Sequence, residues 1–358
     1  MQTLRSSWAL ALCMALLAVG AEGSEPGREA STPDAAIVSG ADLVGRIDFG
    51  AMQSAPIVQK VEQAYKNERV RQVSEANRRF EEATGLKRED LHSIIFSANT
   101  GTFDATLPES KRLEKLDGVI AIALAKPLTL EQLTRGIQAM AADGPPPRIS
   151  RKNLAGRTVL LVRPSMPEQN AAYLATSRDG ATVFLTLSET SLAAALAREH
   201  SGRYQVASAP IVSAQASMPA DSQLRFAFVV PELLRSQIRG GGLDNAKDNP
   251  SAAMMEGFLR NFQNIRSLSL AVGLSQDMAL HLAGDLGDTE SAQQAAMMIQ
   301  TMLAPMLKAA LESRGTPTAI AESFRVEPEG SSLRLGLRLS AEDLDSLASS
   351  EDPAPAGR

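Results

Sequence analysis

Side chains suited to acid–base chemistry are scarce in this chain. Its three histidines are His92, His200 and His281. No two of them have the short spacing of a metal site such as H-x-x-x-H, so the sequence favours structural or solvated roles for all three. His200 ends a predicted helix in "AREHSG", where the helix dipole stabilises a partly cationic side chain.

His281 permits one enzymatic hypothesis. It lies in "DMALHLAG", a predicted strand whose more polar face could also hold Ser267 or Ser269, with an arginine such as Arg334 nearby. A Ser–His pair beside a guanidinium would be a rudimentary nucleophilic site, with His281 as the general base of a hydrolase acting on envelope material. The chain has no G-x-S-x-G elbow to expose such a nucleophile, and we therefore predict no catalytic residue.

Methionines are frequent in the second half of the chain. Met298, Met302 and Met306 recur at every fourth residue, which places them on one face of a predicted helix. Thioether sulfurs can bind Cu(I), but they more often fill apolar cores and grooves. Core packing is the simplest reading of this face; if the chain has a binding site, we expect these three methionines to line an apolar groove. We predict no metal site and no cofactor.

The first residues predict export. Arg5 precedes "WALALCMALLAV", an apolar run of twelve residues, and small residues follow up to Ala21. The run is too short to span a bilayer, which takes about 20 residues, and the pattern is typical of a cleaved signal peptide over residues 1–21. Cleavage removes the only cysteine, Cys13, so disulfides, thiolate catalysis and cysteine-bound zinc are excluded for the mature chain. We expect a periplasmic or extracellular location.

The charge of the chain excludes one class of partner. The formal net charge is −5, and the loss of Arg5 gives −5 − 1 = −6 for the mature chain. This mild acidity is spread along the sequence, so there is no electrostatic footprint for nucleic acid. No later segment is long and apolar enough for a membrane helix, and we predict no integral membrane segment after signal cleavage.

The remaining sequence predicts an α+β fold with antiparallel sheets partly covered by helices. Apolar and polar residues alternate in "QLRFAFVV", "RSLSLAVGL", "DMALHLAG" and "LRLGLRL", as in strands with one covered face. The short connection Ser275–Asp277 predicts a hairpin. A capping box of Thr129 and Gln132 opens a helix running to about Ala141, and Thr289 with Glu290 opens the methionine-rich helix.

Two halves of similar design are predicted. Ser188 aligns with Ser340 at an offset of 152, and in both places an amphipathic strand leads into a Ser-capped helix. A second match, at an offset of 104, places "IALAKPL" on "FAFVVPE". The predicted organisation is a flexible leader over 22–35, a first half over 36–203, a second half with an inserted helix and loop over 204–349, and a disordered tail over 350–358.

Three stretches together resemble uncharacterised secreted bacterial proteins built from two related α/β halves. They are "FEEATGLKREDLHSIIFSA" from Phe80, "LDGVIAIALAKPLTLEQL" from Leu116 and "LRLGLRLSAEDLDSL" from Leu333. The resemblance implies a bacterial, exported protein and transfers no activity and no functional residue.

These features lead us to expect an exported, non-enzymatic binding or interaction protein, with an unknown protein or an apolar ligand as its partner. The envelope hydrolase using His281 is one alternative. A carrier for an apolar small molecule is another, and it would need an enclosed cavity of several hundred Å³.

Overall fold

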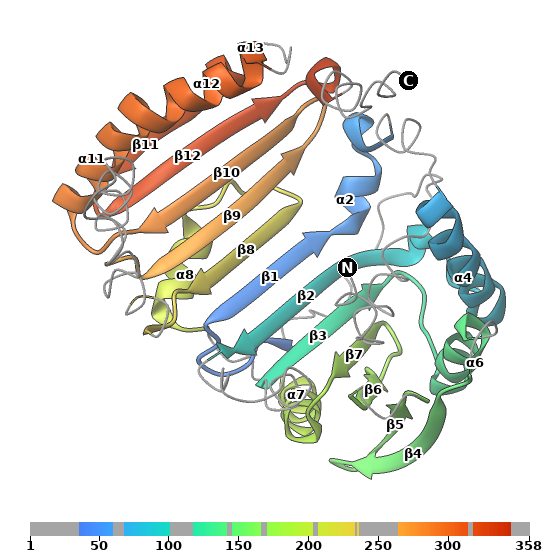
Figure 1. The fold of residues 1–358 in the computed structure, drawn as a ribbon. Helices are drawn as coiled ribbons and strands as arrows, with labels where there is room; N and C mark the ends of the chain where they lie inside the picture. Colours follow the sequence, from blue (N-terminus) through green and yellow to red (C-terminus); the bar gives the residue numbers. More distant parts are fainter. Residues whose placement is uncertain are drawn as a thin grey trace. The chain divides into compact units, whose positions relative to one another are not determined.

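A computed structural model describes the fold of residues 36–59, 68–100, 117–141, 145–165, 170–202, 207–232, 235, 264–313 and 318–344. The predicted signal peptide, leader and tail lie outside these residues. The chain forms two compact units. Unit 1 consists of Met1–Ser54 and Glu62–Ser208, and unit 2 of Ala55–Val61 and Ala209–Arg358. Helices and antiparallel strands occur in both, so the predicted α+β class is confirmed (Figure 1).

The strands of unit 1 form an antiparallel sheet in the order β1-β2-β3-β7-β6-β5-β4 (Figure 1). They are β1 (Leu43–Asp48), β2 (Leu91–Asn99), β3 (Asp117–Leu124), β4 (Arg148–Leu154), β5 (Arg157–Arg163), β6 (Ala172–Thr176) and β7 (Thr182–Thr186). All five residues of β7 are buried. A strand with one polar face would alternate, so helices must cover both faces of this sheet at its centre.

The helices of unit 1 are α2 (Phe49–Gln53), α4 (Glu68–Thr84), the 3-10 turn η3 (Arg88–Asp90), α6 (Leu130–Met140) and α7 (Glu189–Ser201). Two neighbouring residues of β4 show that α6 and α7 lie on opposite faces. Arg151 forms an ion pair with Glu131 of α6, and Lys152 forms one with Glu189 of α7. Successive side chains of a strand point to opposite faces, so the sheet is sandwiched between the two helices.

The main core of unit 1 lies under α4 and α6. It includes Phe80 of α4, Leu133 and Ile137 of α6, and Leu174 and Leu185 of the sheet. The predicted capping box is present: Thr129 Oγ1 accepts from the Gln132 amide at 3.2 Å, and Gln132 Oε1 accepts from the Thr129 amide at 3.0 Å. Capping satisfies N–H groups that the first helical turn leaves without partners, which sets where α6 begins.

A buried serine of β2, Ser97, holds Ala36 and Val38 on the sheet of unit 1. Ser97 Oγ donates to the Ala36 carbonyl at 2.7 Å and accepts from the Val38 amide at 2.9 Å. Ala36 and Ser97 are both buried. A buried polar group without a partner lowers the stability of the fold. The Ser97 hydroxyl supplies two hydrogen bonds that an apolar residue could not supply.

The strands of unit 2 follow the order β8-β9-β10-β12-β11 (Figure 1). They are β8 (Leu224–Val229), β9 (Ser267–Leu274), β10 (Met278–Asp285), β11 (Arg325–Glu329) and β12 (Ser332–Leu339). Each strand predicted by alternation is present, and β9 and β10 form the predicted hairpin, with Leu274 opposite Met278. Ala55–Val61 belongs to this unit: the Ile57 amide donates to the Ser275 carbonyl at 3.2 Å.

The helices of unit 2 are α8 (Ala209–Ala216), α11 (Thr289–Met298), the π-helical segment η6 (Ile299–Leu303), α12 (Ala304–Ser313) and α13 (Thr318–Ser323). The N-cap of α11 is Asp288, one residue before the predicted opening, because its carboxylate accepts from the Ser291 amide at 2.7 Å. Ala292, Ala295 and Ile299 of the continuous helix pack into the core of the unit.

The two sequence matches differ in how they relate to the strand order. In the match at offset 152, β7 and β12 each stand fourth when counted from β1 and β8. Each is followed by a serine cap: Ser188 accepts from the Ser191 amide and Ser340 from the Asp343 amide. The match at offset 104 pairs β3, the third strand, with β8, the first, so it does not join equivalent positions. The duplication itself stays a prediction.

Candidate functional site

The methionines predicted to line a groove lie on the continuous helix α11–η6–α12. Met298 and Met302 are partly buried, and Met306 is 66% exposed. None of the three is in the described core, to which this helix contributes alanines and Ile299. Met297, which the sequence analysis did not single out, is 65% exposed. The helix therefore presents thioether side chains to solvent instead of burying them all.

The π-helical segment determines how these methionines line up. The Ala304 amide donates to the Ile299 carbonyl, five residues back, which is the bond of a π turn. In a regular helix Met298 and Met306, eight residues apart, would differ by about 80° around the axis. One extra residue in the turn reduces this difference to about 20°, so the two side chains lie nearly in line.

The sheet of unit 2 has a leucine face, which we define as Phe226, Leu270, Val272, Leu280, Leu282, Leu335 and Leu337. The strand register places these residues in adjacent rows, such as Leu335, Leu282, Leu270 and Phe226 across four strands. Helix α11 packs at the β11–β12 side of the sheet, where Val326 and Leu333 are buried. Every member of the leucine face is only partly buried. Apolar area thus remains in contact with solvent on a surface otherwise built like a core.

The proposed partners of His281 do not gather around it. The residues directly opposite on β9 and β12 are Ala271 and Gly336. Ser269 pairs with Ala283, so it is a diagonal neighbour of His281 across the two strands. Diagonal neighbours lie about 7–8 Å apart. Ser269 is buried whereas His281 is exposed, and within the described residues no hydrogen bond joins His281 to a serine. This arrangement supplies no nucleophile–base pair.

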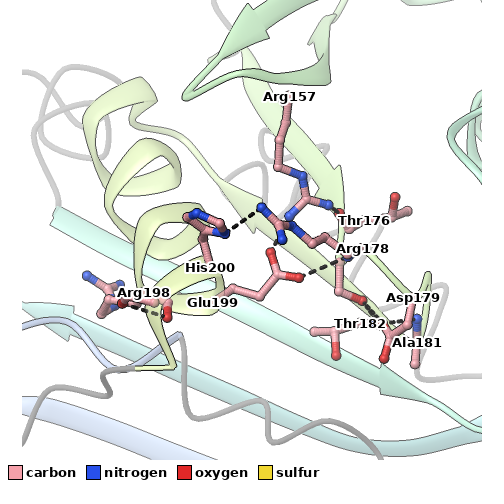
Figure 2. Close-up of polar contacts among 11 residues, drawn as sticks. Arg157, Thr176, Arg178, Asp179, Ala181, Thr182, Arg198, Glu199 and His200 are labelled. Atoms are coloured by element: carbon pink, nitrogen blue, oxygen red, sulfur yellow. Dashed lines mark hydrogen bonds and ion pairs between the residues drawn. The ribbon is translucent and has the colours of Figure 1, made fainter.

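A cluster of polar side chains in unit 1 surrounds Glu199, near the end of α7 (Figure 2). Its carboxylate pairs with Arg157 of β5 through one oxygen and accepts from the Arg178 amide at 2.9 Å through the other. Arg157 also donates to the Thr176 carbonyl. The Arg157 and Glu199 side chains are 19% and 17% exposed. Both carboxylate oxygens are engaged in fastening α7 to the sheet, so Glu199 is not placed to act as a general base.

The turn between β6 and β7 completes this cluster. Ser177 Oγ donates to Asp179 Oδ1 at 2.6 Å and accepts from the Thr182 amide at 2.8 Å, while Gly180 adopts the left-handed conformation that the turn requires. Arg178 contacts His200 through Nδ1 of the imidazole. Figure 2 shows Arg178, Glu199 and His200 directed at one another, which is the arrangement of a structural network.

Arg198 of α7 and Tyr173 of β6 have shifted pKa values. Burial lowers the pKa of the Arg198 guanidinium, and the charge of Asp117 opposes this effect. Burial also raises the pKa of the Tyr173 phenol, and the neighbouring Glu189 carboxylate raises it further. Tyr173 donates to Glu189 at 3.3 Å, and Lys152 donates to the same oxygen at 2.6 Å. Tyr173 and Lys152 are thus both bonded to Glu189 and do not form a nucleophile with its base.

The described residues contain no group of three or more His, Cys, Asp or Glu side chains that could hold a metal ion. Among the same residues, no helix has both the length and the apolar composition needed to cross a bilayer. An apolar void in the core of unit 1, lined by residues including Phe80, Leu133 and Leu174, measures about 10 Å³. That volume would admit about one water molecule and is far too small for an apolar ligand.

Comparison with known proteins does not identify the chain. It matches no protein-family model, and no curated protein is similar in sequence. A solved structure titled "Structure of crystal form I of TP0453" is similar to it with a TM-score of 0.41 and 11% sequence identity. That match covers 89% of this chain and 97% of the other. A likeness this weak assigns no function.

Proposed function

We propose that this protein is an exported binding or interaction protein without enzymatic activity, and that unit 2 binds an apolar ligand or the apolar surface of a partner. The observation that carries the proposal is the leucine face, which stays partly exposed although its residues alternate as those of a core strand do. The exposed methionines of the adjoining helix segment in the same unit support it.

The chemistry of both surfaces agrees with binding by burial of apolar area. Leucine side chains contribute through area removed from water, at roughly 25 cal/mol per Å². Methionine adds an unbranched, polarisable side chain that adapts to differently shaped partners. Neither surface requires a polar group with a shifted pKa.

A fluorescent apolar anion, 1-anilinonaphthalene-8-sulfonate, tests the proposal on the mature chain. We expect saturable binding that Met302→Glu and Met306→Glu each weaken roughly five- to tenfold, because a carboxylate would have to be desolvated beside the bound probe. Val212→Glu is the matched control, since Val212 of α8 is an apolar side chain of the same unit that is 44% exposed. Equal weakening by all three substitutions, or by Val212→Glu alone, would contradict the proposed site.

Oxidation provides a test without mutation. Peroxide should convert the exposed Met297 and Met306 to sulfoxides first, and the bound probe should slow the reaction at Met306. A reaction rate at Met306 that is unchanged by saturating probe would argue against binding at this helix.

Export has its own experiment. Intact mass measurement of the protein recovered from a bacterial periplasm or culture medium should show the loss of residues 1–21. A mass corresponding to the full chain would contradict the predicted signal peptide.

A further inference from the structure

Strands β4 and β5 of unit 1 carry a pair of like charges, one on each strand, that the fold does not neutralise. Arg148 and Arg163 stand directly opposite each other on β4 and β5, and both are exposed. Like charges directly opposite across two strands are destabilising. Over the described parts of the chain, neither guanidinium has a hydrogen bond or an ion pair. An anion between them would remove this repulsion.

The other cations of β4 already have partners, which narrows the site to one face and one end of the strand. Arg151 is paired with Glu131 and Lys152 with Glu189. Arg148 and Lys152 are four residues apart and share the face covered by α7, while Arg151 points to the opposite face. The uncompensated charge therefore lies on the α7 face, at the end of β4 that begins with Arg148.

β4 is also the last strand in the order of unit 1, where it pairs with β5 on one side (Figure 1). In the described structure no strand of the unit pairs with its other side, along which alternate residues present N–H and C=O groups. Five of its seven residues are exposed, and the partly buried Ile149 packs against the core. An extended segment can pair with such an edge by main-chain hydrogen bonds.

Charge decides which segment would fit. Cationic edges resist pairing with a copy of themselves, because a second β4 would bring more arginines against Arg148 and Arg163. The same charges favour a strand that carries carboxylates. The two arginines would therefore attract an acidic partner strand and repel a basic one. On an added strand, the residue opposite Arg148 would lie on the same face as both arginines.

We propose that β4 is a docking edge for an extended acidic peptide segment of another protein, which adds as a further strand and places a carboxylate at Arg148 and Arg163. This site lies in unit 1 and does not depend on the apolar binding proposed for unit 2.

The test titrates the mature chain with a labelled peptide of alternating Thr and Glu, as long as β4, followed by fluorescence anisotropy. We expect binding at peptide concentrations up to about a millimolar, weakened by added salt because the attraction is between partly exposed charges. Arg148→Gln and Arg163→Gln should each reduce affinity roughly tenfold. Arg151→Gln, on the opposite face of the same strand, should have little effect.

Three further arms separate the possible origins of a signal. The same peptide with Gln in place of Glu should bind much more weakly. An acidic peptide methylated on the backbone nitrogens that would face β4 should also bind much more weakly, because it cannot donate main-chain hydrogen bonds to the strand. Inorganic phosphate should not displace the acidic peptide beyond the effect of an equal ionic strength of chloride. Circular dichroism melting of each variant confirms that it is folded.

The proposal is overturned by any of four results: no binding, equal binding of the Glu and Gln peptides, unchanged affinity in both Arg148→Gln and Arg163→Gln, or full binding of the methylated peptide. The last result would leave a charge attraction without strand addition. A fifth result, specific displacement by phosphate, would also overturn the proposal, because it would assign the arginines to a small anion.

Discussion

Gly136 of α6 is the position at which the packing of unit 1 should be least tolerant. A Cβ added there would lie 2.5 Å from Phe80 Cε2 and 2.6 Å from Thr84 Cγ2, both on α4. Real Cβ contacts are not this short, so Gly136→Ala must push α4 and α6 apart or force rotamer changes in α4.

Neither neighbour can move easily. Phe80 is 3% exposed within the core, and Thr84 Oγ1 is held by a donated bond of 2.7 Å to the Phe80 carbonyl and an accepted bond from the Leu86 amide. Inserting a methyl into a packed core costs typically 1–3 kcal/mol, and rigid neighbours favour the upper end. Alanine in place of glycine stabilises a helix interior by about 1 kcal/mol. The clash should prevail, with a net loss of about 2 kcal/mol.

Urea unfolding and thermal melting measure this loss. For a unit of this size, about 2 kcal/mol corresponds to a fall of roughly 4–8 °C in Tm. Phe80→Leu in the Gly136→Ala background provides the control, because removing ring atoms should recover part of the loss, with a coupling of about 0.5 kcal/mol or more. A neutral or stabilising effect of Gly136→Ala would refute the close approach of α4 and α6.

Three further substitutions test other contacts. Ser97→Ala should destabilise unit 1 by about 1–3 kcal/mol in urea unfolding, because the amide of Val38 and the carbonyl of Ala36 lose their buried partner. Ile57→Ala should lower the stability of unit 2 by about 2–5 kcal/mol, as seen by calorimetry, since Ile57 is 2% exposed and belongs to that unit; an effect confined to unit 1 would contradict the assignment. The Ser291 backbone and hydroxyl hydrogen bonds hold the pKa of Asp288 below its ordinary value of 3.8, so the carboxylate stabilises unit 2 above that pH and the contribution is lost as pH falls below it. Asp288→Ala should therefore lower Tm at pH 7 and have a much smaller effect near pH 2; an equal effect at both would argue against the cap.

The sequence by itself determined the features that depend on neighbouring residues. Alternation located β8, β9, β10 and β12, because a strand with one apolar face has a period of two. Capping located the starts of helices at Thr129, Ser188 and Ser340, because a hydroxyl reaches an amide only three residues away.

Tertiary structure decided what lies against each element, which no local pattern contains. β7 and the centre of β5 are buried on both faces, so they show no alternation, and β4 is polar because it lies at an edge. The spacing of Met298, Met302 and Met306 could be read from the sequence, but the burial of these side chains could not. It depends on the alanine face of the same helix, which packs in the core of unit 2. It also depends on a π turn, which changes the direction of the side chains around the helix axis. The burial of an apolar side chain is a property of the residues that cover it, and in this protein they come from distant parts of the chain.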